Sequence, residues 1–305
     1  MNLDRITDIS HKLVKKININ NNDLLNKFPV NNYLKLLNNY PQTIYYHYVS
    51  AEIKEYCNNI VKLGGEDLLG LYHQLILIEL ILNAPDKLKL LNLPEDIKVL
   101  YNKNFKRIVE KIESEPGNCF TYLYDSFCKD LAVCSLRMIP VGARKIHLSS
   151  ISRGFLFRKG LPQFVKRGLF VLFELGGLSP LFGMHTDSND NDLMAEFNHE
   201  GFVRTCIRIA ELLKANENVK GLFGSSWFYD PQLEVISPRL AYLSQIITKN
   251  GGKSFYAGQS EQATQDAILK SPTRRRLYKE GKYIPTIYMV VWPRKKLINW
   301  ANKLI

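Results

Sequence analysis

Apolar residues recur at helical spacing through the first third of the chain. Side chains three and four positions apart are apolar, which is the pattern of a helix with one buried face. The helices predicted in this way cover residues 33–39, 51–63, 66–83 and 95–113. Pro94 directly precedes two acidic residues, a sequence typical of a helix start. The run Glu115-Pro116-Gly117-Asn118 then breaks the pattern, so we predict a helical N-terminal domain over residues 1–115.

Beyond residue 118, short segments of β type alternate with helical ones. Strands are predicted over residues 131–139, 144–150, 181–185, 219–223, 253–257 and 286–292. Helices are predicted over residues 156–175, 196–215, 238–248, 263–280 (interrupted at Ser271-Pro272) and 294–304. Such alternation is typical of helices packed on a sheet. The sequence therefore predicts an α+β protein, with the helical N-terminal region followed by a mixed α/β layered domain over residues 118–305 that contains one continuous sheet.

Positive charge is concentrated near the C-terminus. The chain has 41 Lys and Arg against 29 Asp and Glu, a formal net charge of +12. One basic cluster comprises Arg274, Arg275, Arg276, Lys279 and Lys282, and a second comprises Arg294, Lys295 and Lys296. These clusters favour an anionic ligand, nucleic acid or an anionic surface, or they form a solvated basic face. Because consecutive helical positions point about 100° apart, we expect at least two of Arg274, Arg275 and Arg276 to be exposed.

The cysteines and the apolar runs bear on whether the protein is cytoplasmic, secreted or membrane-spanning. The five cysteines are odd in number and form no C-x-x-C pair, which favours reduced thiols in a cytoplasmic protein. The N-terminus has no apolar region of the secretory type. The apolar runs 68–84 and 168–184 each contain an acid and are shorter than the roughly 20 residues of a membrane span. We predict that both are core segments and that the chain has no transmembrane span.

The densest candidate chemistry lies in the segment 221–231 and directly after it. Its residues follow a predicted strand, and loops at strand ends carry the sites of layered α/β folds. The predicted substrate-binding residues are Ser225, Ser226, Trp227 and Tyr229, with Asp230 as a catalytic candidate. Ser237 with Pro238 is predicted to cap the next helix, and Arg239 to anchor an anion. The alternative is an aromatic loop that plugs the core, with Asp230 capping the turn.

Acidic and histidine side chains in the segment 184–199 form a second group of candidates. His185-Thr186-Asp187 has the spacing of two ligands of an iron-binding triad, but no histidine follows His199. Glu196 and His199 have the spacing of a di-iron pair, of which the chain has only one copy. We therefore predict no metal and take His185, Asp187 and Glu196 as candidate general bases. The expected pocket is lined by Trp227, Tyr229, Asp230 and Arg239 and reaches His185 or Asp187.

The segment 273–283, with the sequence TRRRLYKEGKY, resembles the helix and turn near the C-terminus of GNAT-type N-acyltransferases. The order of predicted elements over residues 218–292 is similar to that family as well. The resemblance implies acyl-CoA as a substrate and a position equivalent to the family's general acid at Tyr278. It also implies a loop that cradles the CoA pyrophosphate at a helix N-terminus. The matching stretch, residues 230–238, has no glycine, so Ser237 and Arg239 would supply the phosphate contacts.

Three hypotheses follow from these observations. The first is an acyl-CoA-dependent N-acyltransferase-like enzyme that acts on a small amine or amino-acid-like substrate. The second is a non-catalytic binding protein whose basic clusters meet nucleic acid or an anionic surface. The third is a metal-dependent oxygenase that uses His185 and Asp187.

Overall fold

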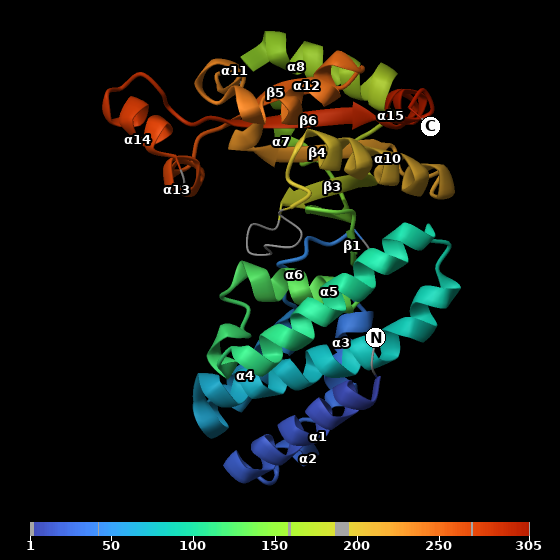
Figure 1. Cartoon of the computed structure of the whole chain (residues 1–305), viewed down its shortest axis with the longest axis vertical. Helices are drawn as coiled ribbons and strands as arrows, with labels where there is room; N and C mark the ends of the chain where they lie inside the picture. Colours follow the sequence, from blue (N-terminus) through green and yellow to red (C-terminus); the bar gives the residue numbers. More distant parts are fainter. Residues whose placement is uncertain (1–2, 42, 158–159, 187–194, 270, 305) are drawn as a thin grey trace. The chain divides into compact units, whose positions relative to one another are not determined.

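A computed structural model of the chain describes residues 3–41, 43–157, 160–186, 195–269 and 271–304. The chain forms two compact units, Met1–Pro140 and Val141–Ile305. The first unit is helical and the second contains a mixed sheet with helices packed on it, as Figure 1 shows by colour from blue to red. The predicted α+β fold class is therefore confirmed.

The first unit consists of helices and ends in a short strand. Its elements are α1 (Leu3–Asn20), α2 (Leu24–Lys27), α3 (Val30–Asn38), α4 (Ala51–Leu90), α5 (Glu95–Ser114), η1 (Gly117–Cys119), α6 (Asp125–Cys134) and β1 (Met138–Pro140). Helix α4 begins at the cap Ser50, whose hydroxyl accepts from the backbone N–H of Ile53. Gly64 and Gly65 leave helical geometry inside α4 and kink it, which explains why the sequence pattern predicts two separate helices there.

Helix α4 also supplies the central core of this unit. It is the one helix in the described part of the chain that is long and apolar enough to cross a membrane, and 72% of its most apolar window is buried within the protein. Gly70 lies so close to Gly117 that a Cβ at Gly70 would stand 1.9 Å from the Gly117 carbonyl oxygen. The Pro-Gly break at residues 116–117 therefore packs directly on α4 rather than separating two domains.

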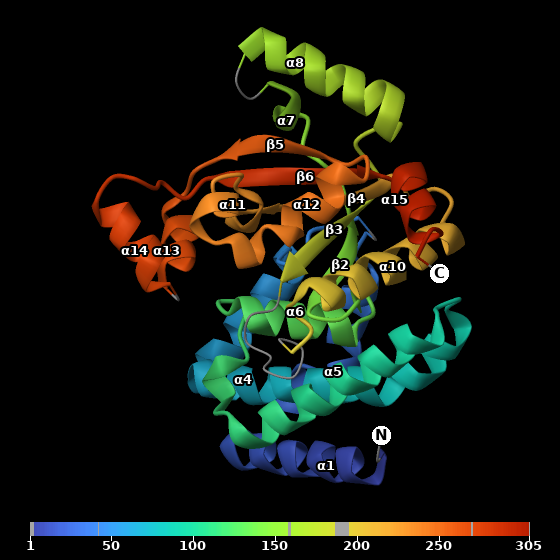
Figure 2. The same ribbon diagram turned by 45° about the horizontal axis from the view of Figure 1, so that its top comes forward.

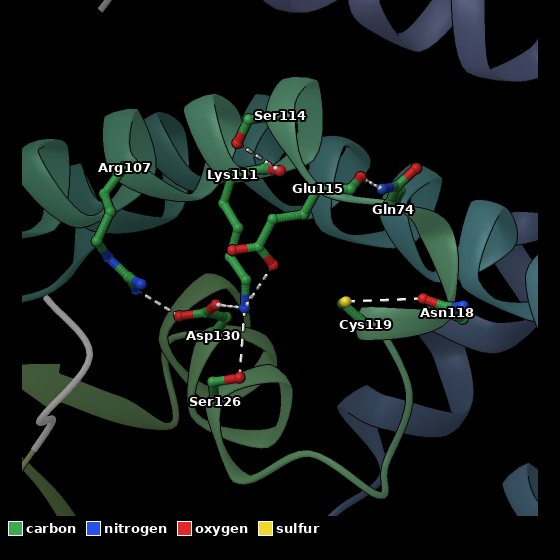
Figure 3. A network of polar contacts seen from close by, with 9 residues as sticks. All are labelled: Gln74, Arg107, Lys111, Ser114, Glu115, Asn118, Cys119, Ser126 and Asp130. Carbon is green, nitrogen blue, oxygen red and sulfur yellow. Dashed lines mark hydrogen bonds and ion pairs between the residues drawn. The ribbon is translucent and has the colours of Figure 1, made fainter.

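The segment 131–139 begins in helix α6 and enters strand β1 only at Met138, which corrects the continuous strand predicted there. Residues 127–134 in α6 are all buried, and a short run that is buried on every side has no period that separates helix from strand. Asp130 of α6 forms ion pairs with Arg107 and Lys111 of α5, as Figure 3 shows. These buried contacts tie α6 to α5, so the first compact unit continues to Pro140 instead of ending at residue 115.

A network of tyrosine hydroxyls surrounds the buried His73 of α4. The Tyr33 hydroxyl lies 3.1 Å from His73 Nε2 and 2.7 Å from the Tyr122 hydroxyl. His73 Nδ1 lies 2.7 Å from the Phe120 carbonyl oxygen, so this nitrogen carries the proton and Nε2 accepts. Burial lowers the pKa of His73 to about 4. The histidine is therefore a neutral part of the core near neutral pH.

The second unit alternates strands and helices. Its strands are β2 (Arg144–Ser149), β3 (Leu181–Thr186), β4 (Gly221–Ser226), β5 (Lys253–Gly258) and β6 (Ile287–Pro293). Its helices are α7 (Gly154–Phe157), α8 (Gly160–Leu169), η2 (Phe170–Leu175), α10 (His199–Ala215), η3 (Trp227–Tyr229), α11 (Leu233–Ile236), η4 (Pro238–Leu240), α12 (Tyr242–Lys249), α13 (Glu261–Leu269), α14 (Pro272–Lys279) and α15 (Arg294–Ala301). The strands lie in the order β2-β3-β4-β6-β5, and β3-β4 is the parallel pair among antiparallel ones.

Helices cover both faces of this sheet (Figure 2). On one face, side chains of α7 and η2 form a core with strand residues and with the loop residue Ile151; its members are Ile151, Phe155, Phe170, Leu175, Leu181, Phe255 and Val291. On the other face lie α10, α12 and α15. Trp292, next to Val291 and thus on the opposite face, contacts Trp300 of α15 and donates to the Asn250 carbonyl. Strand β6 is a short apolar run rich in β-branched and aromatic residues, buried over its last four positions, which is why a strand was predictable there.

Candidate active site

The parallel strands β3 and β4 part towards their carboxyl ends. Their ladder covers the pairs Phe182–Leu222 and Gly183–Phe223. Beyond it, β3 continues to Thr186 along β2, and β4 continues to Ser226 along β6. In Figure 1 the arrows of β3 and β4 point the same way. Ligands of α/β sheets bind outside the carboxyl ends of parallel strands, so this opening is the candidate site of the second unit.

Basic side chains gather on one face of the sheet beside the opening. His185 of β3 is directly opposite the buried Lys145 of β2, and His147 is opposite Gly183, so all three side chains share a face. His185 Nε2 lies 3.1 Å from His147 Nδ1. One of these nitrogens donates and the other accepts, so His147 fixes the orientation of the His185 ring. Two residues beyond the Gly183–Phe223 pair, the exposed Ser225 of β4 corresponds to His185 of β3, and period-two alternation puts both on the same face.

A buried arginine lies on the opposite face, where α10 begins. Arg144 of β2 is 3% exposed and donates to the Thr186 hydroxyl at 2.8 Å. Its guanidinium lies 5.5 Å from the ring centre of Phe197 and 5.0 Å from that of Phe202, so it stands beside the first turn of α10. Its Nη2 atom has no hydrogen-bond partner among the described residues. A buried guanidinium nitrogen without a partner is a position where an anion would be stabilised.

The start of α10 adds further donors next to this arginine. Asn198 caps the helix, its side-chain oxygen accepting from the Gly201 N–H at 2.8 Å. The remaining N–H groups of the first turn and the helix dipole make such an end favourable for negative charge. The rings of Phe197 and Phe228 lie 5.5 Å apart and connect this end of α10 to η3. The helix start and the end of β4 thus lie side by side.

Tyr229 fills the space between the two strands on this face. A Cβ at Gly224 would stand 2.9 Å from the Tyr229 hydroxyl and 3.4 Å from Met184 Cε, so β4 needs glycine there. Tyr229 is 2% exposed. Burial raises the pKa of its hydroxyl, and the positive charge of Arg144 opposes that shift. Tyr229 is therefore a neutral phenol close to Arg144.

Glu196 contacts Arg208 and the loop that contains Gly142. Its Oε2 lies 3.2 Å from Arg208 Nη1. A Cβ at Gly142 would stand 2.4 Å from Glu196 Oε2, and the φ of +124° at this residue also favours glycine. Arg208 donates to the Val141 carbonyl as well, at 3.1 Å. Because Glu196 is engaged in an ion pair with Arg208, it is a weaker candidate for a general base than His185.

Trp227 and Asp230 belong to a buried cluster behind the opening. Asp230 is 2% exposed and accepts from the N–H groups of Gln232 at 3.0 Å and Thr286 at 3.1 Å. Arg274 is also buried; its guanidinium stacks on Trp227 at 4.8 Å and donates to the Ser237 hydroxyl at 3.0 Å. These contacts match the core-plug alternative for Trp227 and Asp230.

Several predicted site residues occupy other positions. Ser237 precedes Pro238 at the start of η4, but its hydroxyl accepts from Arg274 instead of capping the helix. Arg239 is exposed, and Tyr278 on α14 is 40% exposed. The Ser226 hydroxyl accepts from the Phe228 N–H at 3.2 Å, and Asp187 lies outside the described residues.

The two basic clusters contain both buried residues with internal contacts and exposed residues. Arg274 is buried whereas Arg275 and Arg276 are exposed, which confirms that at least two of the three face solvent. Arg294 donates to the Asn216 carbonyl at 2.7 Å. Lys296 lines an open cleft of about 330 Å³ together with Lys249, Gly251, Asn250, Asn299, Trp300 and Lys303. A more apolar cleft of about 560 Å³ adjoins it, and both include Asn250 and Trp300.

Within the described ranges, no three His, Cys, Asp or Glu side chains form a group that could hold a metal ion. The five cysteines, all within those ranges, form no disulfide.

Comparison with known proteins finds structural neighbours only. No family model and no characterised protein matches the sequence. The fold is similar to crystal structures of an acyltransferase in complex with decanoyl-CoA and teicoplanin (TM-score 0.44, 10% identity) and with CoA and 10C-teicoplanin (0.43, 10%). A complex with decanoyl-CoA alone gives a TM-score of 0.42 at 12% identity. For the first two, the match covers 73% of this chain and 66% of the matched chain, so this chain spans just under two thirds of their length.

Proposed function

We propose that the second unit is an acyl-CoA-dependent N-acyltransferase of the GNAT type that acts on a small amine or amino-acid-like substrate. The observation that carries the proposal is the parting of β3 and β4 beside the start of α10 and the buried Arg144. The main-chain edges of two diverging strands suit an extended ligand with amide groups. The first turn of α10 and the Arg144 Nη2 atom suit the phosphates at one end of such a ligand.

His185 is the proposed general base. In the reaction the amine nitrogen attacks the thioester carbonyl carbon, a C–N bond forms, and the C–S bond breaks. His185, held by His147, takes the proton of the amine, and the CoA thiolate leaves and is protonated. Lys145 lies on the same face, where its positive charge would stabilise negative charge that develops on the carbonyl oxygen. Ser225 and Ser226, at the end of β4, would contact the acyl acceptor.

The other candidate residues have supporting roles in this proposal. Asp187 would be a second base near the end of β3, since it directly follows Thr186 in sequence. The exposed Arg239 would contact an anionic part of the ligand. Tyr278 is the proposed general acid by resemblance. Trp227, Tyr229, Asp230, Ser237 and Glu196 would shape the site through the contacts described above.

Binding and catalysis are tested separately. Thermal unfolding of the intact protein is followed with and without CoA, because a ligand at 100 times its Kd stabilises by about 2.7 kcal/mol. Arg144→Lys and Arg144→Met should weaken this stabilisation, whereas the matched control Arg275→Met removes an exposed charge and should leave it unchanged. Absence of stabilisation by CoA and by acetyl-CoA at millimolar concentration would refute the proposal.

Catalysis is measured by release of the CoA thiol from acetyl-CoA in the presence of a panel of amines. His185→Gln should retain CoA binding and lose turnover, because the base and not the binding contacts has been removed. His185→Gln with full turnover would exclude His185 as the base.

A second candidate function is non-catalytic binding of an anionic partner. It is favoured by the three lysines of the 330 Å³ cleft, Lys249, Lys296 and Lys303. Retention on heparin should fall steeply with salt, and replacing these three lysines by Gln should reduce the slope. Retention that is unchanged by the three substitutions would exclude this cleft.

A further inference from the structure

The helix formed by α8 and η2 exposes large apolar side chains along one side. Val165 and Leu169 are 54% and 51% exposed, and Leu172 and Phe173 are 69% and 75% exposed. Phe157 of α7 is 66% exposed. On the other side of the same helix, Arg167, Phe170 and Leu175 are buried, and the latter two belong to the core beneath the sheet. We call the exposed side, made of Phe157, Val165, Leu169, Leu172 and Phe173, the apolar ridge.

The exposure of the ridge is not explained by the fold of this unit. The buried side of the helix is held by internal contacts, because the Arg167 guanidinium donates to the Tyr256 carbonyl at 2.9 Å and stacks on Phe155. Rotating the helix to bury the ridge would break these buried contacts. Contiguous exposed apolar surface of this kind marks a contact with a partner or a membrane.

The charge around the ridge identifies the partner. Residues 151–175 contain five Lys and Arg, of which Arg167 is buried, and one acidic residue, Glu174. Glu174 forms an ion pair with Lys253 of β5. Arg153 and Lys166 are exposed. A helix with Phe, Leu and Val on one side and basic residues on and beside it is the pattern of a segment that lies in the interface of an anionic bilayer.

We propose that the apolar ridge inserts into the surface of a membrane that contains anionic lipids. The apolar side chains would enter the boundary between headgroups and acyl chains, while Arg153 and Lys166 contact the anionic headgroups. The helix would lie along the surface and would not cross the bilayer. This inference does not depend on the proposed acyltransferase activity.

Co-sedimentation with lipid vesicles tests the proposal. The full chain should bind vesicles of phosphatidylcholine mixed with phosphatidylserine, and bind vesicles of phosphatidylcholine alone more weakly. The double variant Leu172→Ser, Phe173→Ser should lower the affinity at least about tenfold, since two large apolar side chains no longer leave water. The double variant Arg153→Gln, Lys166→Gln should reduce the preference for the anionic vesicles.

The controls separate the ridge from general stickiness. Leu90 and Leu123 are 87% and 86% exposed and lie in the first unit, so Leu90→Ser with Leu123→Ser should leave vesicle binding unchanged. The ridge variants should keep the wild-type melting temperature, because their side chains are exposed. Failure of the wild-type protein to bind either vesicle, or equal binding by the ridge variant, would overturn the proposal. A wild-type dimer that becomes a monomer in the ridge variant, without vesicle binding, would assign the ridge to a contact between two copies.

Discussion

Asp230→Asn distinguishes a structural carboxylate from a catalytic one. Each Asp230 oxygen accepts one backbone N–H, from Gln232 and from Thr286. Asparagine keeps the shape but has one oxygen, so one N–H is left facing an NH₂ group. Loss of one buried hydrogen bond and an unsatisfied buried donor cost about 1–3 kcal/mol. In a unit of this size that corresponds to a fall of roughly 2–12 °C in melting temperature.

The pH dependence of this variant adds an independent check. Burial raises the pKa of Asp230, although its two backbone hydrogen bonds oppose the shift. The folded protein therefore binds this proton more readily than the unfolded chain does. The contribution of Asp230 to stability is largest below the unfolded carboxyl pKa of about 3.9 and declines as the pH rises through the pKa of the folded form. The stability difference between wild type and variant should thus be larger near pH 4 than at pH 7.

The assay combines urea unfolding at both pH values with the acyl-transfer measurement. A structural Asp230 predicts a lower free energy of unfolding, and turnover per folded molecule close to that of the wild type. An unchanged melting temperature together with lost turnover would refute the structural interpretation and place the carboxylate in the reaction.

Three further outcomes follow from the buried groups. Gly142→Ala should destabilise more than Gly258→Ala by about 1 kcal/mol in thermal unfolding, since both residues have φ near +124° but only at Gly142 would a Cβ meet Glu196. Ellman's reagent should label Cys119 in the folded protein and the other four cysteines only after unfolding, because Cys119 is the partly exposed thiol. His73 should make the free energy of unfolding fall by about 3 kcal/mol between pH 6.5 and pH 4, because its folded pKa of about 4 lies below the unfolded value; His73→Gln should flatten this dependence in urea titrations.

The order of elements in the second unit was predictable because the elements have clear sequence patterns. Strand β6 is a short apolar run rich in β-branched and aromatic residues, buried over its last four positions, and the helix predicted over 196–215 has one apolar side, as α10 shows. The interruption at Ser271-Pro272 is also confirmed, since Ser271 caps α14. In α6 every residue from 127 to 134 is buried, so no period distinguished helix from strand. Whether this segment is a helix or a strand is determined by its contacts with α5, which form only in the tertiary fold.

The basic residues of β2 could have been found from the sequence. The strand reads RKIHLS, and its period of two places Lys145 and His147 on one face and Arg144 on the other. Charged residues on both faces of a strand between apolar neighbours are costly to bury without partners. Three basic residues in one short strand could therefore have indicated a candidate site. Their position beside His185, however, depends on the pairing of β2 with β3. Register between strands 40 residues apart is not contained in local periodicity.

The segment 225–229 contains both exposed and buried residues, and the number of polar and aromatic residues in the sequence does not tell which are which. Ser225 lies beyond the part of β4 that pairs with β3, and its side chain is exposed. The chain then turns into η3, which carries Trp227 and Tyr229 back under the sheet, where Trp227 stacks on Arg274 and Tyr229 lies against Gly224. The polar side chains at the opening therefore come from β2 and β3, whereas Trp227 and Tyr229 are buried within the protein.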